Sequence, residues 1–466
     1  MNIDAQISRG TQRSIAVAQQ NPKRPPVSRR QFLRSALGAS ASTMLLAACG
    51  GAAGGQAGAT QAPAQAGGEQ QVSALMWSNT PVMDGNFKKR AEQFNAAQGG
   101  KIKVDLQLLP YDQYWPKIDL AYASKKPYDM YFWDVQAYGH YKAGLLSDLQ
   151  PYVDASSGLM DTNQYPVALY DNWRFDGAHL FALPENLQTM GLYYNKDLFD
   201  QAGVKPPDDT WTWDMVRDAA QQLTKSEGGK PTQWGFSLGE LGGWWGVQTL
   251  AWSLGGSFVD KPVEPTRFQL SEAPNVQAMQ YLQDMIWKDQ FAPNTEQASA
   301  VAQDTGIFQT GKVAMFPGGS WNISAFKNVK FKWDLAPIPK GTGERVPPFW
   351  FGGWVIPKAS AVPDAAFAFA RWSATEYQKT MATDLDWIPI QKDARESDAM
   401  RQGMPPGMQS VLAAINGARL GDIYHRNGQK IIAEVFGPAL EQLWNNKITP
   451  ADAAKQIDDQ ANPLLK

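Results

Sequence analysis

The chain is rich in tryptophan, a residue type that can bind ligands: eighteen of the 466 residues are Trp. An indole offers a large flat surface and one N–H donor, and a carboxylate accepts charge-assisted hydrogen bonds from hydroxyl groups. The combination suits a ligand that has apolar faces and polar rims. The candidates for such a site are Trp77, Asp134, Glu185, Trp244, Trp245, Trp321, Trp354 and Trp387.

Each candidate also has a structural interpretation, because Trp is usually a core residue. Trp244 and Trp245 are adjacent and flanked by glycines, so at least one indole must face away from any single buried face. Trp354 follows two glycines, which would let a ligand approach the backbone. Asp134 ends a predicted strand, where it could instead cap a helix. For the other candidates both interpretations stay open. The tryptophans within helical patterns are expected to serve packing: Trp213, Trp372 and Trp444.

Other chemistries lack the residues that they need. The three His and the single Cys show no paired ligand spacing, so we expect no metal and no cofactor. The sequence also has no phosphate-binding Gly-rich loop and no G-x-S-x-G nucleophile turn. A glycoside hydrolase would need two carboxyls about 5–5.5 or 6.5–9.5 Å apart, which Asp134 and Glu185 could supply. A surface-anchored glycoside hydrolase and a lectin therefore stay open as alternatives.

The first 49 residues carry the features of an export signal. They hold a net charge of +6, which leaves −8 of the total of −2 for the rest of the chain. The segment 28–33, Ser-Arg-Arg-Gln-Phe-Leu, resembles a twin-arginine signal, and the apolar run 35–48 is too short to span a membrane. Leu46–Gly50 resembles the bacterial lipobox, which implies lipidation of Cys49. The alternative is a disordered basic tail with a chance Cys.

Residues 50–71 are rich in Gly, Ala and Gln and predict a flexible linker with an r.m.s. length of about 25 Å. The acidic body that follows disfavours nucleic acid as a partner, because nucleic acid attracts basic surfaces. We expect an exported protein, anchored by its lipid on the outer face of the cell membrane or in the periplasm.

The body alternates strand and helix signals, which predicts an α/β fold with a mostly parallel sheet. The signals predict strands at 72–77, 102–108 and 128–133 and a helix at 113–124. A further helix between the first two strands has Phe87, Ala91 and Phe94 on one face, with Lys88, Lys89, Arg90 and Glu92 between them. Thr212, Pro363 and Thr449 mark further helix starts. In open sheets of this kind, ligands bind beyond the carboxyl ends of the strands, where Trp77 and Asp134 fall.

Several segments together resemble one family, the extracellular solute-binding proteins of ABC importers, and within it the maltose-binding-protein-like sugar binders of family 1. The segments that carry the resemblance are 128–134 with 143–149, 183–199, 202–213, 311–315, 320–321, 352–358 and 387–389. They follow the order of the family and cover nearly all of 72–466.

The resemblance implies a two-lobed periplasmic-binding-protein fold of type II, with a ligand cleft between the lobes. Lobe 1 would comprise 72–183 and 349–378, and lobe 2 would comprise 184–348 and 379–466, joined by a hinge at 183–185 and 347–349. It also implies a monomeric protein without enzymatic activity. Such a protein captures a sugar or oligosaccharide and delivers it to the transmembrane subunits of an ABC permease.

Overall fold

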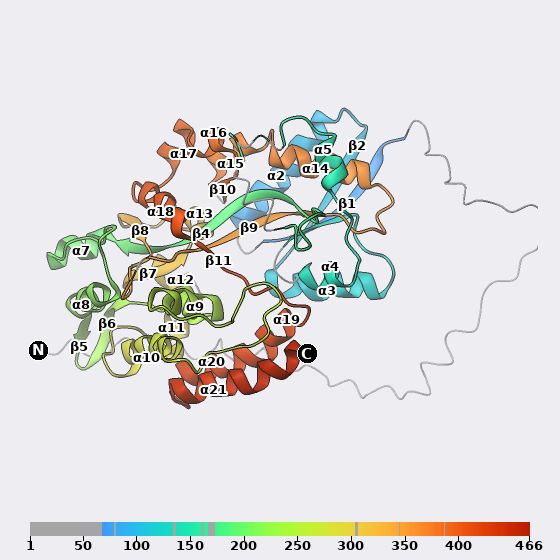
Figure 1. The fold of residues 1–466 in the computed structure, drawn as a ribbon. Coiled ribbons are helices and arrows are strands. Elements are labelled where there is room, and N and C mark those ends of the chain that lie inside the picture. Colours follow the sequence, from blue (N-terminus) through green and yellow to red (C-terminus); the bar gives the residue numbers. More distant parts are fainter. Residues whose placement is uncertain are drawn as a thin grey trace, which may run out of the picture. The chain divides into compact units, whose positions relative to one another are not determined.

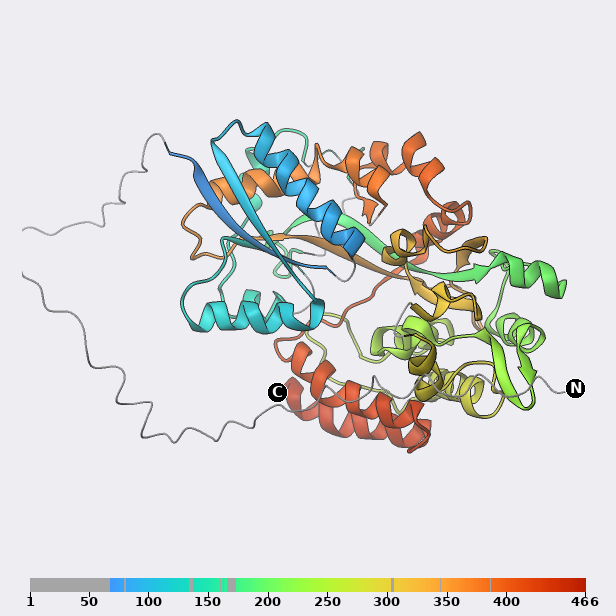
Figure 2. The same ribbon diagram turned by 180° about the vertical axis from the view of Figure 1, so that it is seen from behind.

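The computed structural model describes residues 68–78, 81–133, 137–159, 161, 163–165, 173–302, 306–343, 345–385 and 387–466. The described residues form one compact unit, shown from two sides in Figures 1 and 2. The predicted signal, Cys49, most of the linker and Asp134 lie outside the described residues. The first strand begins at Gln70, so the last two residues of the predicted linker belong to the sheet.

The predicted alternation of strands and helices at the start of the body is confirmed. The elements are β1 (Gln70–Trp77), α2 (Pro81–Ala97), β2 (Ile102–Leu109), α3 (Tyr111–Ala123) and β3 (Met130–Phe132). β1 pairs in parallel with β2 on one side and with β3 on the other. The carboxyl ends of these strands therefore point in one direction, as expected.

The sheet as a whole is mixed, so the prediction of a mostly parallel sheet was wrong. Its order is β2-β1-β3-β9-β4-β7-β6-β5, with β8 and β10 also paired to β4 and β11 to β9. The further strands are β4 (Leu183–Asn195), β5 (Lys225–Glu227), β6 (Lys230–Phe236), β7 (Val313–Gly319), β8 (Trp333–Pro337), β9 (Pro348–Val355), β10 (Ile388–Pro389) and β11 (Arg419–Leu420). The antiparallel pairs all involve the central strands β4 and β9 or the β5–β6 hairpin.

The long strand β4 joins the two halves of the sheet (Figure 1). Its first half, Leu183 to Thr189, pairs with β9, and its second half, Met190 to Asn195, pairs with β7 and β8. Almost every residue of β4 is buried, because other strands or helices cover both of its faces. The chain thus passes from one half to the other along β4 and returns along β9.

The remaining helices surround the sheet. They are α4 (Ala137–Lys142), α5 (Gln150–Asp154), α7 (Lys196–Ala202), α8 (Trp213–Leu223), η1 (Gly239–Gly242), α9 (Trp244–Ser253), α10 (Ala273–Trp287), α11 (Thr295–Val301), α12 (Gly306–Gln309), η2 (Ser320–Asn322), α13 (Ile323–Phe326), α14 (Pro363–Ala374), α15 (Gln378–Asp384), α16 (Lys392–Arg395), α17 (Asp398–Gly403), α18 (Met408–Ala414), η3 (Ile415–Gly417), α19 (Gly428–Ile431), η4 (Ile432–Phe436), α20 (Gly437–Trp444), α21 (Pro450–Ala461) and η5 (Asn462–Leu465). The side chains of Thr212 and Thr449 cap α8 and α21, and Pro363 opens α14, as the sequence predicts.

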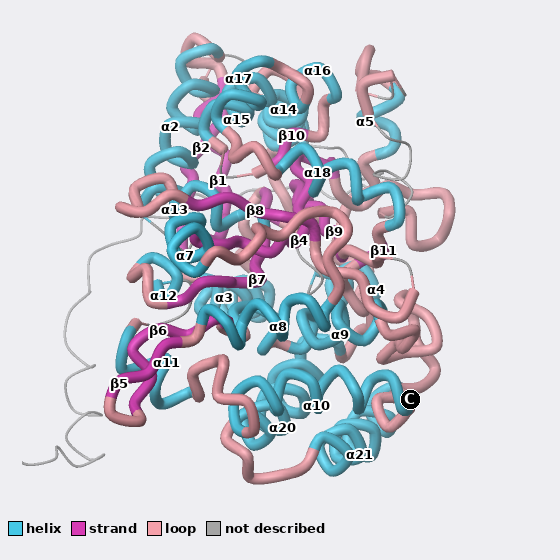
Figure 3. The backbone as a smooth tube through the Cα atoms, turned by 90° about the vertical axis from the view of Figure 1, so that its left-hand side faces the viewer, coloured by secondary structure: helices cyan, strands magenta, loops and turns pink. Residues whose placement is uncertain are grey.

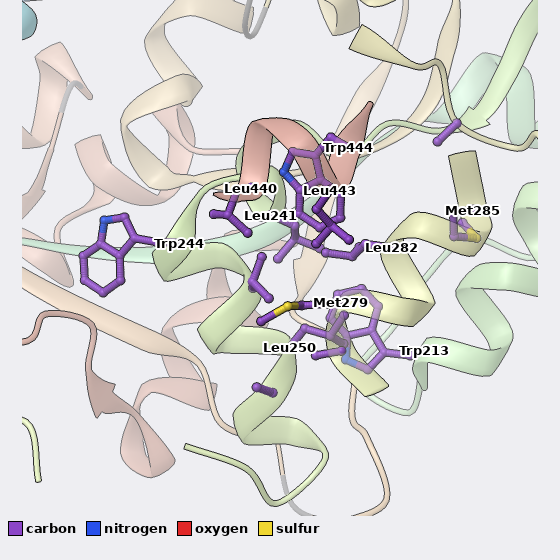
Figure 4. Packing of buried hydrophobic residues seen from close by; sticks show 14 of the residues in the cluster. Trp213, Leu241, Trp244, Leu250, Met279, Leu282, Met285, Leu440, Leu443 and Trp444 are labelled. Atoms are coloured by element: carbon purple, nitrogen blue, oxygen red, sulfur yellow. The ribbon is translucent and has the colours of Figure 1, made fainter. Parts of the chain in front are cut away.

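Buried apolar side chains form separate cores on the two sides of the crossing strands. The first core draws on 72–183 and 354–390, with Tyr424. The second draws mainly on 190–292 and 423–461, and α10, α20 and α21 lie together in it (Figure 3). A third, smaller core includes residues of β4, β7, α12, α13, α15, α17 and α18. Trp213 and Trp444 pack in the second core, which confirms their structural role (Figure 4).

Candidate ligand-binding site

Three indoles meet at the junction of the first two cores. Trp245 is in the first turn of α9, Trp321 is in η2 at the end of β7, and Trp350 is in β9. Their ring centroids lie 5.9 Å (Trp245–Trp321), 5.4 Å (Trp245–Trp350) and 5.6 Å (Trp321–Trp350) apart, and each pair is edge-to-face. All three side chains are half-buried. We call these three residues the indole cluster.

Two acidic side chains hold two of these indoles by their N–H groups. Glu240, in η1, accepts a hydrogen bond from Trp321 Nε1 through its Oε1 at 2.9 Å. Asp422, which follows β11, accepts one from Trp350 Nε1 through its Oδ1 at 3.2 Å. Hydrogen bonds to an ionised acceptor are stronger than neutral ones, so the rings are well fixed in orientation.

Two glycines make room for the same rings. A Cβ on Gly319 would lie 2.2 Å from the ring of Trp321, and a Cβ on Gly421 would lie 2.2 Å from the ring of Trp350. Real Cβ atoms do not approach other atoms so closely, so each indole lies against a backbone that only glycine permits. Glycines next to the indoles are the signal that the sequence offered, and for Trp350 the relevant glycine lies 71 residues further along the chain.

Of the predicted candidates, Trp245 and Trp321 are the two that meet in the half-buried indole cluster. Trp77 ends β1 as expected and is half-buried, but its ring contacts belong to Tyr111, Tyr114 and Phe132 at 5.2–5.6 Å. Trp350 was missed. It lies between Phe349 and Phe351 in β9, and such a run of aromatic residues in the sequence is equally typical of a strand buried in the core.

Trp354 and Glu185 lie in a closed interior. Both are fully buried, and Trp354 Nε1 donates to Glu185 Oε2. The other carboxylate oxygen pairs with Arg90, which is also fully buried and has the rings of Phe87, Trp354, Tyr377 and Trp387 around its guanidinium at 5.0–5.8 Å. Burial raises the pKa of Glu185 overall, although the charge of Arg90 and the hydrogen bonds to the carboxylate act in the opposite direction. In this conformation neither residue has surface to offer a ligand.

The position of Arg90 corrects the interpretation of α2. The sequence placed it among the polar residues between the apolar positions of the helix, yet its side chain points into the core with Phe87 and Ala91. The buried Glu185 explains this, because a charged side chain is stable in a core when an opposite charge and hydrogen bonds compensate it. The pair joins α2 to the crossing strand β4.

Trp244 and Trp387 are also interior residues. Trp387 is 4% exposed and stacks on Phe132 with ring centroids 5.0 Å apart. Trp244 is 9% exposed, lies away from the other labelled side chains in Figure 4 and contacts Phe436. It lines a small, mainly apolar pocket with residues that include Phe268, Ile423 and His425. The adjacent pair Trp244–Trp245 thus points in two directions, as the flanking glycines led us to expect.

A loop from the second half of the molecule reaches the first at a separate place. Glu264, which precedes α10, accepts a hydrogen bond from Tyr138 Oη at 2.7 Å and pairs with Lys142 Nζ at 3.0 Å, both in α4. Its backbone has a left-handed φ of 48°, which is uncommon for a residue with a Cβ. Burial would raise the pKa of Glu264, but these two partners lower it overall.

Within the described residues, no group of three or more His, Cys, Asp and Glu side chains could hold a metal ion. Among the helices of these described residues, none combines the length and the apolar character that crossing a membrane requires.

A sheet crossed by two long strands, with a core on each side and aromatic side chains at the junction, defines a two-lobed ligand-binding protein. Residues 77–379 match the family described as bacterial extracellular solute-binding protein, and the chain belongs to this family. The family and the similar proteins below are binding proteins rather than enzymes.

The chain is 28% identical over 261 residues to the maltodextrin-binding protein of Bacillus subtilis, across 54% of this chain and 58% of the relative. It is 26% identical to the sn-glycerol-3-phosphate-binding periplasmic protein of Pectobacterium atrosepticum, across 62% of this chain and 67% of the relative. An ABC substrate-binding protein of Listeria monocytogenes, solved in complex with cycloalternan, has a TM-score of 0.76 and 23% identity over 85% of this chain and 99% of that one. The last similarity shows the two-lobed fold.

Proposed function

We propose that this chain is the substrate-binding component of an ABC importer and that it captures a neutral sugar or oligosaccharide on the indole cluster. The observation that carries the proposal is the meeting of Trp245, Trp321 and Trp350, half-buried, at the junction of the two cores. Half-buried indoles at such a place leave aromatic surface for a ligand, and pyranose rings present C–H faces that stack on it.

The hydrogen bonds of the cluster favour recognition by stacking. The N–H groups of Trp321 and Trp350 are occupied by Glu240 and Asp422, so these rings offer a ligand mainly their faces. Among the hydrogen bonds made by the described residues, none comes from the Trp245 N–H, which leaves it as a donor for a sugar hydroxyl. We therefore propose Trp245, Trp321 and Trp350 as ligand contacts, with Trp77 and Asp134 as further candidates.

The charge around the cluster favours a neutral ligand. The relatives include both a maltodextrin binder and an sn-glycerol-3-phosphate binder. Two carboxylates touch the indole cluster directly, and a negatively charged phosphate beside them would be repelled. A sugar or oligosaccharide without phosphate suits this environment better.

The rest of the proposed transport function is supported by the family, the crossing strands and the predicted leader. We propose lobes of 72–183 with 349–378 and 184–348 with 379–466, although Met381, Trp387 and Ile390 of the second lobe pack in the first core. The lobes close around the ligand through β4 and β9. Delivery to the transmembrane subunits of a permease, export through the twin-arginine signal, lipidation of Cys49 and a monomeric state complete the proposal. A protein of this kind binds its sugar without hydrolysing it.

A thermal-shift screen tests the proposed function. Ligand at 100 times its Kd adds about 2.7 kcal/mol to the free energy of unfolding. With an unfolding entropy of about 2.1 cal/mol/K per residue over roughly 400 residues, the melting temperature should rise by about 3 °C. We expect this rise with maltotriose or another neutral oligosaccharide and none with sn-glycerol-3-phosphate.

Two controls accompany the screen. One tests whether the shift depends on the indole cluster, and the other tests whether the protein hydrolyses the sugar. Trp321→Ala should abolish the shift, whereas Trp287→Ala, which changes an exposed indole in α10, should keep it. The sugar should be recovered intact after prolonged incubation. Turnover of the sugar, or a shift with sn-glycerol-3-phosphate alone, would overturn the proposal.

A further inference from the structure

Glu240 collects three donors from a single short segment that lies far from it in the sequence. Its Oε2 accepts the backbone N–H of Gly319 at 2.6 Å. Its Oε1 accepts Trp321 Nε1 at 2.9 Å and Asn322 Nδ2 at 3.0 Å. The segment is the end of β7 together with η2, so the carboxylate of Glu240 links the turn that carries Trp321 to η1, the 3-10 helix that precedes α9.

These bonds determine where the indole points. Trp321 lies in a three-residue 3-10 helix, an element too short to fix a large side chain by helical packing. Its ring lies back over Gly319, and the carboxylate holds both the N–H of that glycine and the N–H of the ring. Rotation of the ring would break the hydrogen bond between Trp321 Nε1 and Glu240 Oε1. The half-buried indole N–H would then lack its acceptor, which is unfavourable.

We infer that Glu240 is a positioning residue: it holds Trp321 edge-on to Trp245 and Trp350 and thereby builds the platform for the sugar. This inference rests on the proposed function and adds to it a residue that acts through Trp321. An ionised carboxylate has about four acceptor sites, and three of those on Glu240 are occupied by protein donors.

The conservative variant separates positioning from charge. The two donors on Oε1, Trp321 and Asn322, can bond the carbonyl oxygen of a glutamine equally well, whereas the amide N–H₂ would face the N–H of Gly319. Glu240→Gln therefore keeps the bond to the indole, and Glu240→Ala removes all three. If Glu240 acted through its charge on the ligand, both variants would lose binding alike.

Near-ultraviolet circular dichroism of the ligand-free protein tests the positioning directly. Three indoles 5.4–5.9 Å apart and edge-to-face couple electronically, and the signal depends on their mutual orientation. We expect Glu240→Ala to reduce this signal as much as Trp321→Phe does, and Glu240→Gln to keep most of it. The affinity for maltotriose should fall about tenfold in Glu240→Ala and less than threefold in Glu240→Gln.

A stability-matched variant supplies the control. Asn275→Ala removes a buried amide that bonds two carbonyls in the second core and does not touch the indole cluster. It should lower the melting temperature and leave both the dichroism and the affinity unchanged. A Glu240→Ala protein whose dichroism matches the wild type would overturn the inference, whatever its affinity. Unchanged maltotriose binding in Trp321→Ala would instead overturn the proposed function.

Discussion

The buried pair of Arg90 and Glu185 yields a sharp prediction about stability. In Arg90→Met the side-chain volume is nearly kept, but the carboxylate of Glu185 stays fully buried with Trp354 as its remaining strong donor. Removing one partner of a buried ion pair costs about 3–5 kcal/mol, because the other charge is left uncompensated. Glu185→Leu should cost as much, since it leaves the Arg90 guanidinium among four aromatic rings.

The size of the effect in a melting experiment follows from the size of the compact unit. About 400 residues at about 2.1 cal/mol/K each give an unfolding entropy near 0.8 kcal/mol/K, so each single variant should melt about 4–6 °C lower. The double variant Arg90→Met with Glu185→Leu should recover much of this loss, because an apolar replacement of a buried pair is often neutral.

Differential scanning calorimetry of the four proteins gives the coupling free energy by a double-mutant cycle. The reasoning is refuted if the decrease in melting temperature of the double variant equals the sum of the decreases of the two single variants.

The same proteins test whether Glu185 contacts the ligand. Sugar affinity measured well below the melting temperature should be unchanged in Glu185→Leu, whereas a loss of affinity without a loss of stability would return Glu185 to the ligand contacts.

Three further predictions follow from the other contacts and from the leader. Gly421→Ala should push the ring of Trp350 aside and weaken sugar binding about tenfold by calorimetry, whereas Gly417→Ala, with its nearest neighbour at 3.5 Å, should bind normally; equal affinities would place the ligand elsewhere. The lowered pKa of Glu264 stabilises the fold above about pH 4.3, its unfolded value, and this stabilisation is lost as the pH falls through the folded pKa. The melting-temperature gap between wild type and Glu264→Gln should therefore shrink progressively as the pH falls below about 4.3, and a gap that does not change with pH in this range would contradict the prediction. Cys49→Ser should move the exported protein from the membrane fraction to the soluble fraction, and continued membrane retention would argue against the lipid anchor.

The fold was predictable where the pattern of one element decides its environment. The apolar run at 72–77 lies within β1, which begins two residues earlier, and the face formed by Phe87, Ala91 and Phe94 is the buried face of α2. The direction of β4 and β9 could not be read in this way. An isolated strand has the same alternation whether its neighbour runs parallel or antiparallel, and here the neighbours come from segments about 160–170 residues apart.

The candidate site was predictable only in part, because the sequence does not distinguish a tryptophan in a hydrophobic core from one that stacks on a ligand. Trp245 and Trp321 were identified through flanking glycines and resemblance, but the same arguments selected Trp354, which is fully buried. Trp350 and Glu240 were missed. Their roles depend on partners 72 and about 80 residues away, Asp422 for Trp350 and Trp321 for Glu240. Such pairings exist only once the chain has folded.

The measurement that tests the central claim most directly is a crystal structure of the protein with the oligosaccharide that gives the largest thermal shift. The account predicts a sugar ring stacked at van der Waals distance on the face of Trp245, Trp321 or Trp350, with both lobes in contact with the ligand. A sugar bound at any place that none of these three indoles touches would contradict it.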